Sequence, residues 1–146
     1  EAETVVVKHG GTIEKFIGDA IMVVFLPTLD SAAPTVRAVH AAEELLAAVS
    51  LMNERRERQG LFTINVGAGI ATGPLLMGTI GNQQGRRDYS VTGKTVLLAA
   101  AMEKLTRQVA GKKVVLCPSS FEIATSAGIR AKKLSLANTD EGYEVL

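Results

Sequence analysis

Near the start of the chain, hydrophobic residues form two short runs on either side of a Gly-Asp pair. Residues 12–16 alternate weakly between polar and apolar positions, and residues 20–26 are uninterruptedly apolar. Two β-like runs around a tight polar tip are typical of a β-hairpin, so we expect Gly18 and Asp19 to form its turn. The apolar character of the second run predicts a buried strand. Pro27 ends this strand, because proline has no N–H to donate to a strand ladder.

A long amphipathic helix is expected over residues 33–58. Its apolar residues recur at steps of three and four, which places them on one face: Val36, Val39, Ala42, Leu45, Leu46, Val49 and Met52. Pro34 suits the first turn of this helix. Asp30 or Ser31 is the expected N-cap, and Gly60 marks the end of the helix.

The rest of the chain mixes short β runs with two more helices. The strand-like segments are 62–72, 75–80, 89–91, 113–117, 130–134 and 141–145, and the helical segments are 96–108 and 118–126. The last two strands are expected to pair. Residues 4–9 fit either a strand or the last turn of a helix, which Gly10 and Gly11 end. This order predicts an α+β fold, a mixed α/β sandwich in which helices pack on one mainly antiparallel sheet, as a single domain over residues 1–146.

Composition narrows the class of protein. The 146 residues carry a formal net charge of +1, with 47% hydrophobic and 21% charged residues, which is typical of a globular domain. A near-neutral charge and 4% aromatic residues argue against nucleic acid or a membrane surface as a partner. A lone cysteine and apolar runs too short to span a membrane favour an intracellular, cytoplasmic domain. We expect this residue, Cys117, to be buried and unreactive.

Four segments carry a more specific pattern. They are 9–25 (HGGTIEKFIGDAIMVVF), 66–73 (VGAGIATG), 78–81 (GTIG) and 87–96 (RDYSVTGKTV). In this order and spacing they resemble the catalytic domain of class III nucleotidyl cyclases, the adenylate and guanylate cyclases. The register is continuous from about residue 8 to residue 107 and weaker as far as Val145. The resemblance implies a ferredoxin-like cyclase core, a dimer with sites at its interface, and conversion of ATP to 3′,5′-cyclic AMP and pyrophosphate, a phosphorus–oxygen lyase reaction.

The resemblance also implies a divalent metal centre. In the family, two Mg²⁺ or Mn²⁺ ions lie on two aspartates, where one activates the ribose 3′-hydroxyl and the other holds the triphosphate. Asp19 matches the second of these aspartates, and Gly18 leaves room for phosphates to approach the turn. An ordinary turn aspartate is the alternative interpretation. The first aspartate belongs to a strand that would precede Glu1, so we expect the domain to be truncated at its N-terminus.

Purine recognition is implied at two positions. Lys15 stands where adenylate cyclases carry a lysine against the adenine ring, and Ser90 stands where they carry Asp or Thr. Guanylate cyclases carry an acidic residue and usually a cysteine there, so this pair favours ATP. The same substrate-binding segment includes Phe16, Ile17 and Gly18. The alternatives are an exposed strand lysine and a loop hydroxyl that is satisfied within the protein.

The sequence departs from the family pattern on the helix after Gly93. Active members carry an Asn that positions the ribose and an Arg that stabilises the transition state, but here these positions are Leu97 and Ala101, and Lys94 replaces an Asp. Losing one such preorganised group typically costs about 10²–10³ in rate. We therefore expect little or no turnover by this chain alone, with the two apolar residues suited to packing. Lys133 is the candidate for the family's phosphate-binding lysine, although Leu134 follows it where the family has glycine.

Three functions remain open on this reasoning. The chain is a cyclase that works as a homodimer, a regulatory, dimerisation or nucleotide-binding module without catalysis, or one half of a heterodimer whose partner supplies the Asn/Arg helix. Arg86 and Arg87 are interpreted as surface charges, and His9 and His40 as ordinary loop and helix residues without metal-ligand companions.

Overall fold

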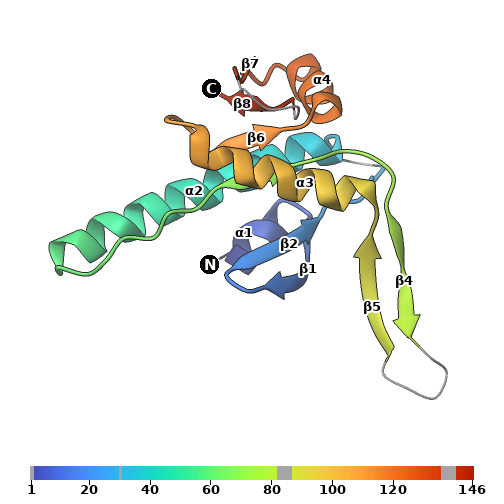
Figure 1. The fold of residues 1–146 in the computed structure, drawn as a ribbon, viewed down its shortest axis with the longest axis horizontal. Coiled ribbons are helices and arrows are strands. Elements are labelled where there is room, and N and C mark those ends of the chain that lie inside the picture. Colours follow the sequence, from blue (N-terminus) through green and yellow to red (C-terminus); the bar gives the residue numbers. More distant parts are fainter. Residues whose placement is uncertain (1, 30, 82–86, 136–140) are drawn as a thin grey trace.

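In the part of the chain that the structure describes, the fold combines four α-helices with three separate sheets (Figure 1). The computed structural model describes residues 2–29, 31–81, 87–135 and 141–146, except for the side chains of residues 80, 81, 87 and 88. The helices are α1 (Ala2–Lys8), α2 (Pro34–Arg58), α3 (Lys94–Leu105) and α4 (Pro118–Ser126), with a short 3-10 helix η1 (Thr106–Gln108). The strands are β1 (Thr12–Ile17), β2 (Ala20–Val24), β3 (Ala68–Ile70), β4 (Leu76–Gly81), β5 (Arg87–Thr92), β6 (Val114–Leu116), β7 (Ala131–Lys133) and β8 (Tyr143–Val145).

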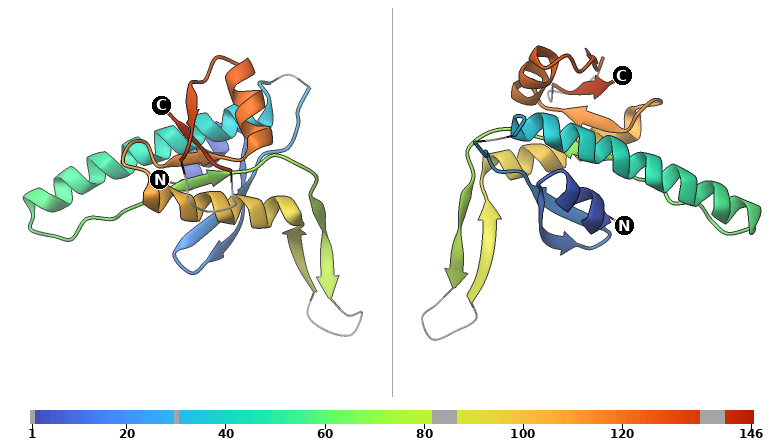
Figure 2. Two further views of the ribbon diagram at one scale, coloured as in Figure 1. Left: turned by 45° about the horizontal axis from the view of Figure 1, so that its top comes forward. Right: turned by 180° about the vertical axis from the view of Figure 1, so that it is seen from behind.

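The sheets are mainly antiparallel, which confirms the expected α+β, mixed α/β fold class. Strands β1 and β2 form one sheet, β4 and β5 a second, and the order β3-β6-β8-β7 forms the third. Among the described strands, only β3 and β6 pair in parallel. The expectation of one sheet is wrong in this respect, because both hairpins form ladders only within themselves. The β4–β5 hairpin projects from the rest of the fold as an arm (Figures 1 and 2).

The segment before the first hairpin is a helix, which decides between the two alternatives for residues 4–9. Val5 and Val6 are the buried residues of α1. The helix ends in a turn where Gly11 N–H donates to the carbonyl of Val6 over 2.9 Å and Gly10 has φ +70°. Glycine adopts this left-handed conformation without steric cost.

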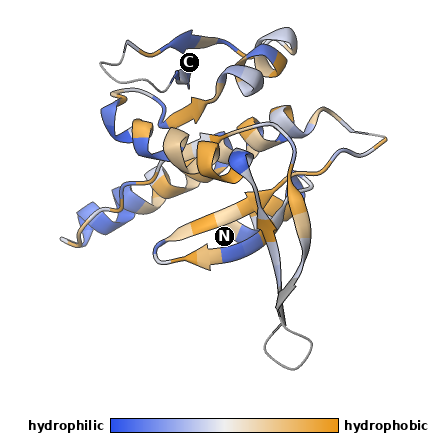
Figure 3. Cartoon of the chain, turned by 45° about the vertical axis from the view of Figure 1, so that its right-hand side comes forward, coloured by the Kyte–Doolittle hydropathy of each residue, from blue (hydrophilic) through white to orange (hydrophobic). Residues whose placement is uncertain are grey.

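The first hairpin has the expected two-residue turn. Ile17 pairs with Ala20, so Gly18 and Asp19 alone form the tip, and Gly18 has φ +63°. Figure 3 shows β2 apolar along most of its length, whereas β1 also carries a hydrophilic stretch. The strand β2 is less buried than its apolar run predicts, because only Val24 is fully buried. Within the described strands, this hairpin forms no ladder with another sheet.

Helix α2 follows the prediction closely at its end and less well at its start. Its buried residues all lie between Thr35 and Ala42, and its second half extends away from the core (Figure 2). Ser31 is not the N-cap, since Ala33 occupies that position without a side-chain cap and Ser31 donates to a neighbouring carbonyl. Asp30 lies outside the described residues. Gly60, with φ +68°, ends the helix as predicted.

The segment predicted as a strand over residues 62–72 is mostly extended chain without a strand partner. Only Ala68–Ile70 joins a ladder, with β6. Before it, the side chain of Asn53 on α2 both donates to the carbonyl of Ile64 over 2.7 Å and accepts from its N–H over 2.9 Å. The strand prediction is therefore wrong for residues 62–67 and 71–72, and at Ile64 a helix side chain binds the main chain in place of a strand partner.

The core lies on both faces of β6. One buried cluster joins α2 and α4 to this strand through Val39, Val114, Leu116 and Ala124. The second cluster packs α3 on the other face through Met102, Leu105, Val115 and Cys117. Cys117 is completely buried, as predicted. Helix α4 and the paired strands β7 and β8 also confirm their predictions.

Candidate functional site

Lys15 and Ser90 lie in direct contact although 75 residues separate them. Lys15 Nζ donates to Ser90 Oγ over 2.8 Å, and both residues are half-buried. Lys15 is on β1, just after a register irregularity that begins at Ile13, and Ser90 is on β5, paired with Gly78. A bulge of this kind redirects the side chains that follow it. The two residues proposed for purine recognition are therefore adjacent before any ligand is considered.

Asp19 occupies the exposed tip of the same hairpin. The described residues contain no group of three or more His, Cys, Asp or Glu side chains that could hold a metal ion. Mg²⁺, however, is commonly bound by one or two carboxylates together with substrate phosphates, without an all-protein cage. A single accessible carboxylate on a turn with a glycine fits that mode of binding, and it does not fit a protein-only metal centre.

Large apolar side chains flank these polar residues and are exposed in the single chain. Phe16 and Ile17 follow Lys15 on β1 with 73% and 56% of their surface exposed, and Tyr89, next to Ser90, is 56% exposed. These fractions are high for aromatic and branched side chains, which usually bury most of their surface. The candidate site is therefore an open, largely apolar surface.

The two residues of α3 that replace the family's Asn and Arg differ in their solvent exposure. Leu97 is 74% exposed, whereas Ala101 is partly buried against the cluster that contains Met102. Packing was expected for both residues, and within this chain the expectation is wrong for Leu97. Lys94 is the first residue of the helix and is exposed.

Lys133 lies apart from the other candidates, on β7 in the four-stranded sheet. Its Nζ donates to Glu141 Oε1 over 2.5 Å, and this hydrogen bond is the main cause of a raised pKa for the lysine. Neighbouring Lys132 pairs with Glu144 over 3.2 Å. In the described part of the chain, Lys133 makes no hydrogen bond or ion pair with Lys15, Ser90 or Asp19. Arg86 and the side chain of Arg87 lie outside the described residues.

The sequence matches a known protein family over most of its length. The model of the adenylate and guanylate cyclase catalytic domain matches residues 3–137. The chain belongs to this family. Its sequence is 36% identical to an adenylate cyclase of Anabaena cylindrica over 126 residues, which cover 78% of this chain and 24% of that protein. It is 32% identical over 117 residues to the terminal-differentiation-specific adenylate cyclase of Dictyostelium discoideum, covering 80% of this chain and 5% of that protein. The cyclase-family chain thus spans a quarter or less of the length of these relatives.

Solved cyclase structures share the fold. The guanylyl cyclase Cya2 superposes with a TM-score of 0.77 at 26% identity, over 99% of this chain and 74% of that chain. The adenylyl cyclase CyaB from P. aeruginosa superposes with a TM-score of 0.80 at 24% identity, over 99% and 76% of the two chains. These likenesses confirm the cyclase-type architecture expected from the sequence.

Two surface hollows of this cyclase-family domain lie outside the candidate nucleotide site. One, of about 530 Å³, lies between α2 and the segments 64–66 and 111–113, and the other, of about 480 Å³, lies beside Lys132 and Lys133. Neither is lined by Lys15, Ser90 or Asp19. Within the described residues, no helix is both long and apolar enough to cross a membrane.

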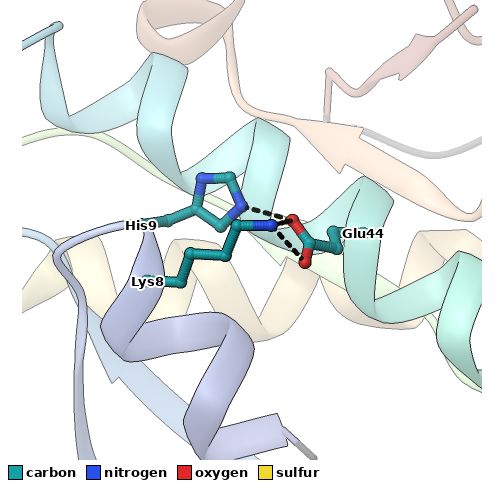
Figure 4. Close-up of polar contacts among 3 residues, drawn as sticks. All are labelled: Lys8, His9 and Glu44. Carbon is teal, nitrogen blue, oxygen red and sulfur yellow. Dashed lines mark hydrogen bonds and ion pairs between the residues drawn. The ribbon is translucent and has the colours of Figure 1, made fainter.

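Sequence reasoning missed a polar cluster that joins α1 to α2 (Figure 4). Glu44 accepts hydrogen bonds from Lys8 Nζ at 2.7 and 2.8 Å, and its Oε2 lies 2.8 Å from His9 Nε2. The bond from Lys8, followed by that from His9, lowers the pKa of Glu44 below its ordinary value. His9, expected to be an ordinary loop residue, instead contacts a carboxylate on a distant helix. No local signal predicts a contact across 35 residues.

Proposed function

We propose that this cyclase-family domain binds ATP at the Lys15–Ser90 pair, together with a divalent cation at Asp19, as part of a dimer with a second cyclase domain. Turnover of ATP to cyclic AMP and pyrophosphate is weak or absent in the chain by itself. The observation that carries the proposal is the 2.8 Å hydrogen bond from Lys15 Nζ to Ser90 Oγ. It supports a purine-recognition pair because it brings a cationic donor and a hydroxyl to one point between two hairpins.

The chemistry of the pair matches an adenine edge. A lysine ammonium has three donors, and a serine hydroxyl has two acceptor lone pairs and one donor. With one lone pair of Ser90 taken by Lys15, the other is available to the exocyclic amino group of adenine, and a free N–H of Lys15 is available to a ring nitrogen. Guanine presents a carbonyl oxygen in place of that amino group and leaves the second lone pair of Ser90 unused, which together with the residue types implied by the resemblance favours ATP over GTP.

Asp19 suits a role at the triphosphate. Mg²⁺ or Mn²⁺ held there would neutralise phosphate charge and polarise the reacting oxygens. Asp19 contributes a hard carboxylate oxygen, and the glycine before it keeps the turn free of a bulky side chain. Phosphate oxygens and water would complete the coordination of a cation held at Asp19.

Weak catalysis is expected because two residues of α3 lack the groups that the reaction needs. Leu97 has no group that could hydrogen-bond a ribose, and Ala101 has no charge to stabilise a pentavalent transition state. Two such losses, at about 10²–10³ each, would bring the rate close to background.

A second candidate function is one half of a heterodimeric cyclase, in which the partner supplies the missing Asn and Arg. The exposure of Leu97, at 74%, favours an arrangement in which another chain covers this face of α3. A regulatory or nucleotide-holding module without turnover makes the same prediction for the isolated chain, but it predicts no rescue by an active partner domain.

Binding and turnover should be measured separately. We expect calorimetry to detect binding of a non-hydrolysable ATP analogue in the presence of Mn²⁺, weakened at least tenfold by Lys15→Ala or Ser90→Ala and unchanged by Lys104→Ala, an exposed lysine on α3. Cyclic AMP production by the chain should stay near background. Absence of analogue binding would refute the proposal, and robust turnover by the homodimer would contradict its catalytic part.

A further inference from the structure

Arg37 is a charged residue buried where α1, the first hairpin and α2 meet. It is only 9% exposed. Its guanidinium donates to four main-chain carbonyls: Nε to Ala32 over 3.0 Å, Nη1 to His9 over 3.1 Å and to Gly10 over 2.9 Å, and Nη2 to Leu26 over 2.5 Å. A planar guanidinium with five donors can satisfy several acceptors in fixed directions at once.

Three of the four bound carbonyls, those of His9, Gly10 and Leu26, lie at the open end of the β1–β2 hairpin. Its ladder closes with the pair Thr12 and Val24. Gly10 comes just before the first strand, and Leu26 comes just after the second. Arg37 therefore joins the two ends of the hairpin to each other and to α2. Since the described strands give this hairpin no ladder to another sheet, few other main-chain bonds can fix its orientation.

Two glycines next to Arg37 leave room for its guanidinium and for the ring of Phe25 beside it. A Cβ atom on Gly10 would lie 2.6 Å from Arg37 Nη1, and one on Gly11 would lie 2.7 Å from the ring of Phe25. The Arg37 Cζ atom in turn lies 5.8 Å from the centroid of that ring. We call Gly10, Gly11, Phe25 and Leu26 the hairpin base. A side chain at Gly10 would therefore collide with the guanidinium, and one at Gly11 would displace the ring of Phe25.

We propose that Arg37 is a positioning residue for the nucleotide site: by fixing the hairpin base it sets the places of Lys15 and Asp19. This inference rests on the proposed function of those two residues. The six residues of β1 span about 20 Å, so a tilt of about 5° at the base moves the tip by about 2 Å. A displacement of about 1 Å at a reacting group can cost about 100-fold in rate.

Arg37→Lys tests this role while keeping the charge. A lysine ammonium cannot reach four carbonyls in the planar pattern that the guanidinium uses. The matched control is Arg56→Lys on the same helix. Arg56 also donates through Nε to a carbonyl, that of Phe62 over 2.6 Å, and its Cζ lies 4.4 Å from the ring of Phe62, far from the hairpin base.

The first measurement is amide hydrogen exchange of the full chain without nucleotide. In Arg37→Lys we expect exchange over residues 12–24 to be about tenfold faster or more, while amides of β6 and β8 change less than twofold. Arg56→Lys should leave both regions unchanged. Val39→Ala, which truncates a fully buried core residue, should accelerate both regions together, because it lowers global stability.

Equal acceleration of the hairpin and of β6 in Arg37→Lys would overturn the proposal, since it would assign Arg37 to general stability. Should this variant fail to fold, Phe25→Leu keeps the guanidinium bonds and removes the ring beneath Arg37, and the same selective acceleration at residues 12–24 is expected. The proposal would also be overturned if Arg37→Lys accelerated exchange only over residues 12–24 but left the affinity for the Mn²⁺-bound ATP analogue unchanged. If wild-type protein binds no nucleotide, the proposed function fails, whereas the exchange data alone decide whether Arg37 fixes the hairpin.

Discussion

Lys15 on β1 and Ser90 on β5 join two hairpins that share no main-chain ladder, through one hydrogen bond of 2.8 Å. Among the described strands, neither hairpin pairs with a larger sheet. The bond between these side chains connects the projecting β4–β5 arm to the first hairpin, and under the proposed function it also brings the two purine-binding groups together. Substitutions at either residue are expected to affect ligand selection more than stability, because one hydrogen bond between two half-buried side chains contributes only modestly to the free energy of unfolding.

Nucleotide preference should follow the identity of this pair. The double substitution of Lys15→Glu and Ser90→Cys places at both positions the residue types that guanylate cyclases carry. We expect it to weaken binding of the ATP analogue and to favour the GTP analogue, because a carboxylate accepts from the guanine N–H groups. Competition calorimetry with both analogues measures the change. Retention of the ATP preference in the double variant would assign base selection to other residues.

Asp19→Asn should remove the metal-dependent part of nucleotide affinity. The amide keeps the size of the side chain but loses the negative charge that a divalent cation requires. In wild-type protein we expect affinity to rise with Mn²⁺ concentration, and in Asp19→Asn this dependence should largely disappear. Glu122→Gln, an exposed carboxylate on α4, is the control and should behave as wild type. The same Mn²⁺ dependence in both variants would leave Asp19 as an ordinary turn residue.

Restoring the family residues on α3 should have unequal structural costs. Leu97→Asn replaces a 74% exposed side chain and should leave stability unchanged, whereas Ala101→Arg enters a packed cluster and should cost about 1–3 kcal/mol. Urea unfolding measures both. We expect cyclic AMP production to rise in the double variant only within a longer protein that carries the upstream aspartate strand implied by the resemblance. No gain there would show that the catalytic defect lies elsewhere.

Acid should weaken the contact between α1 and α2. The pKa of Glu44 is lowered from 4.5, chiefly by the hydrogen bond from Lys8 and then by that from His9. A carboxyl that is more acidic in the folded state adds stability above its unfolded pKa, and this stability is lost as the pH falls through the folded-state value. Glu44→Gln should therefore show a weaker fall in unfolding free energy below about pH 4.5 than wild type. Identical pH profiles for the two proteins would contradict the ion-pair assignment.

Helix α3 should tolerate no side chain beneath it at Gly69. A Cβ atom there would lie 2.1 Å from the main-chain nitrogen of Glu103 and 2.3 Å from the carbonyl oxygen of Ala99. Gly69→Ala must push helix and strand apart, and we expect a loss of about 3 kcal/mol or more in unfolding free energy. Gly78→Ala is the matched control, because nothing lies within 4 Å of its added Cβ. Thermal unfolding of the two variants would show whether the close approach is as strict as the geometry indicates.

Local pattern was enough to predict most elements. The two-residue tip at Gly18 and Asp19, the end of α2 at Gly60 and the bounds of α4 all depend on residues close together in sequence, and all agree with the structure. Solvent exposure was predicted less well. The burial expected for β2 and the packing expected for Leu97 depend on which other segments come close, and periodicity within one segment carries no such information.

For the candidate site, too, motifs predicted the residues better than the contacts between distant segments. Motif order and the family resemblance indicated Lys15, Ser90 and Asp19, and the structure brings the first two together. It leaves Lys133 in another sheet, paired with Glu141. The sequence did not predict a role for Arg37, since an arginine on an amphipathic helix is ordinarily a solvated residue. Its role depends on four carbonyls contributed by three separate stretches of chain.

The amide of Asn53 that pairs with both main-chain groups of Ile64 has a consequence for solubility. Extended segments with free N–H and C=O groups are templates on which other chains can add strands and begin to aggregate. At Ile64 those groups are already occupied by a side chain from the protein's own helix. At this residue, neither main-chain group is therefore left free to pair with a strand of another molecule.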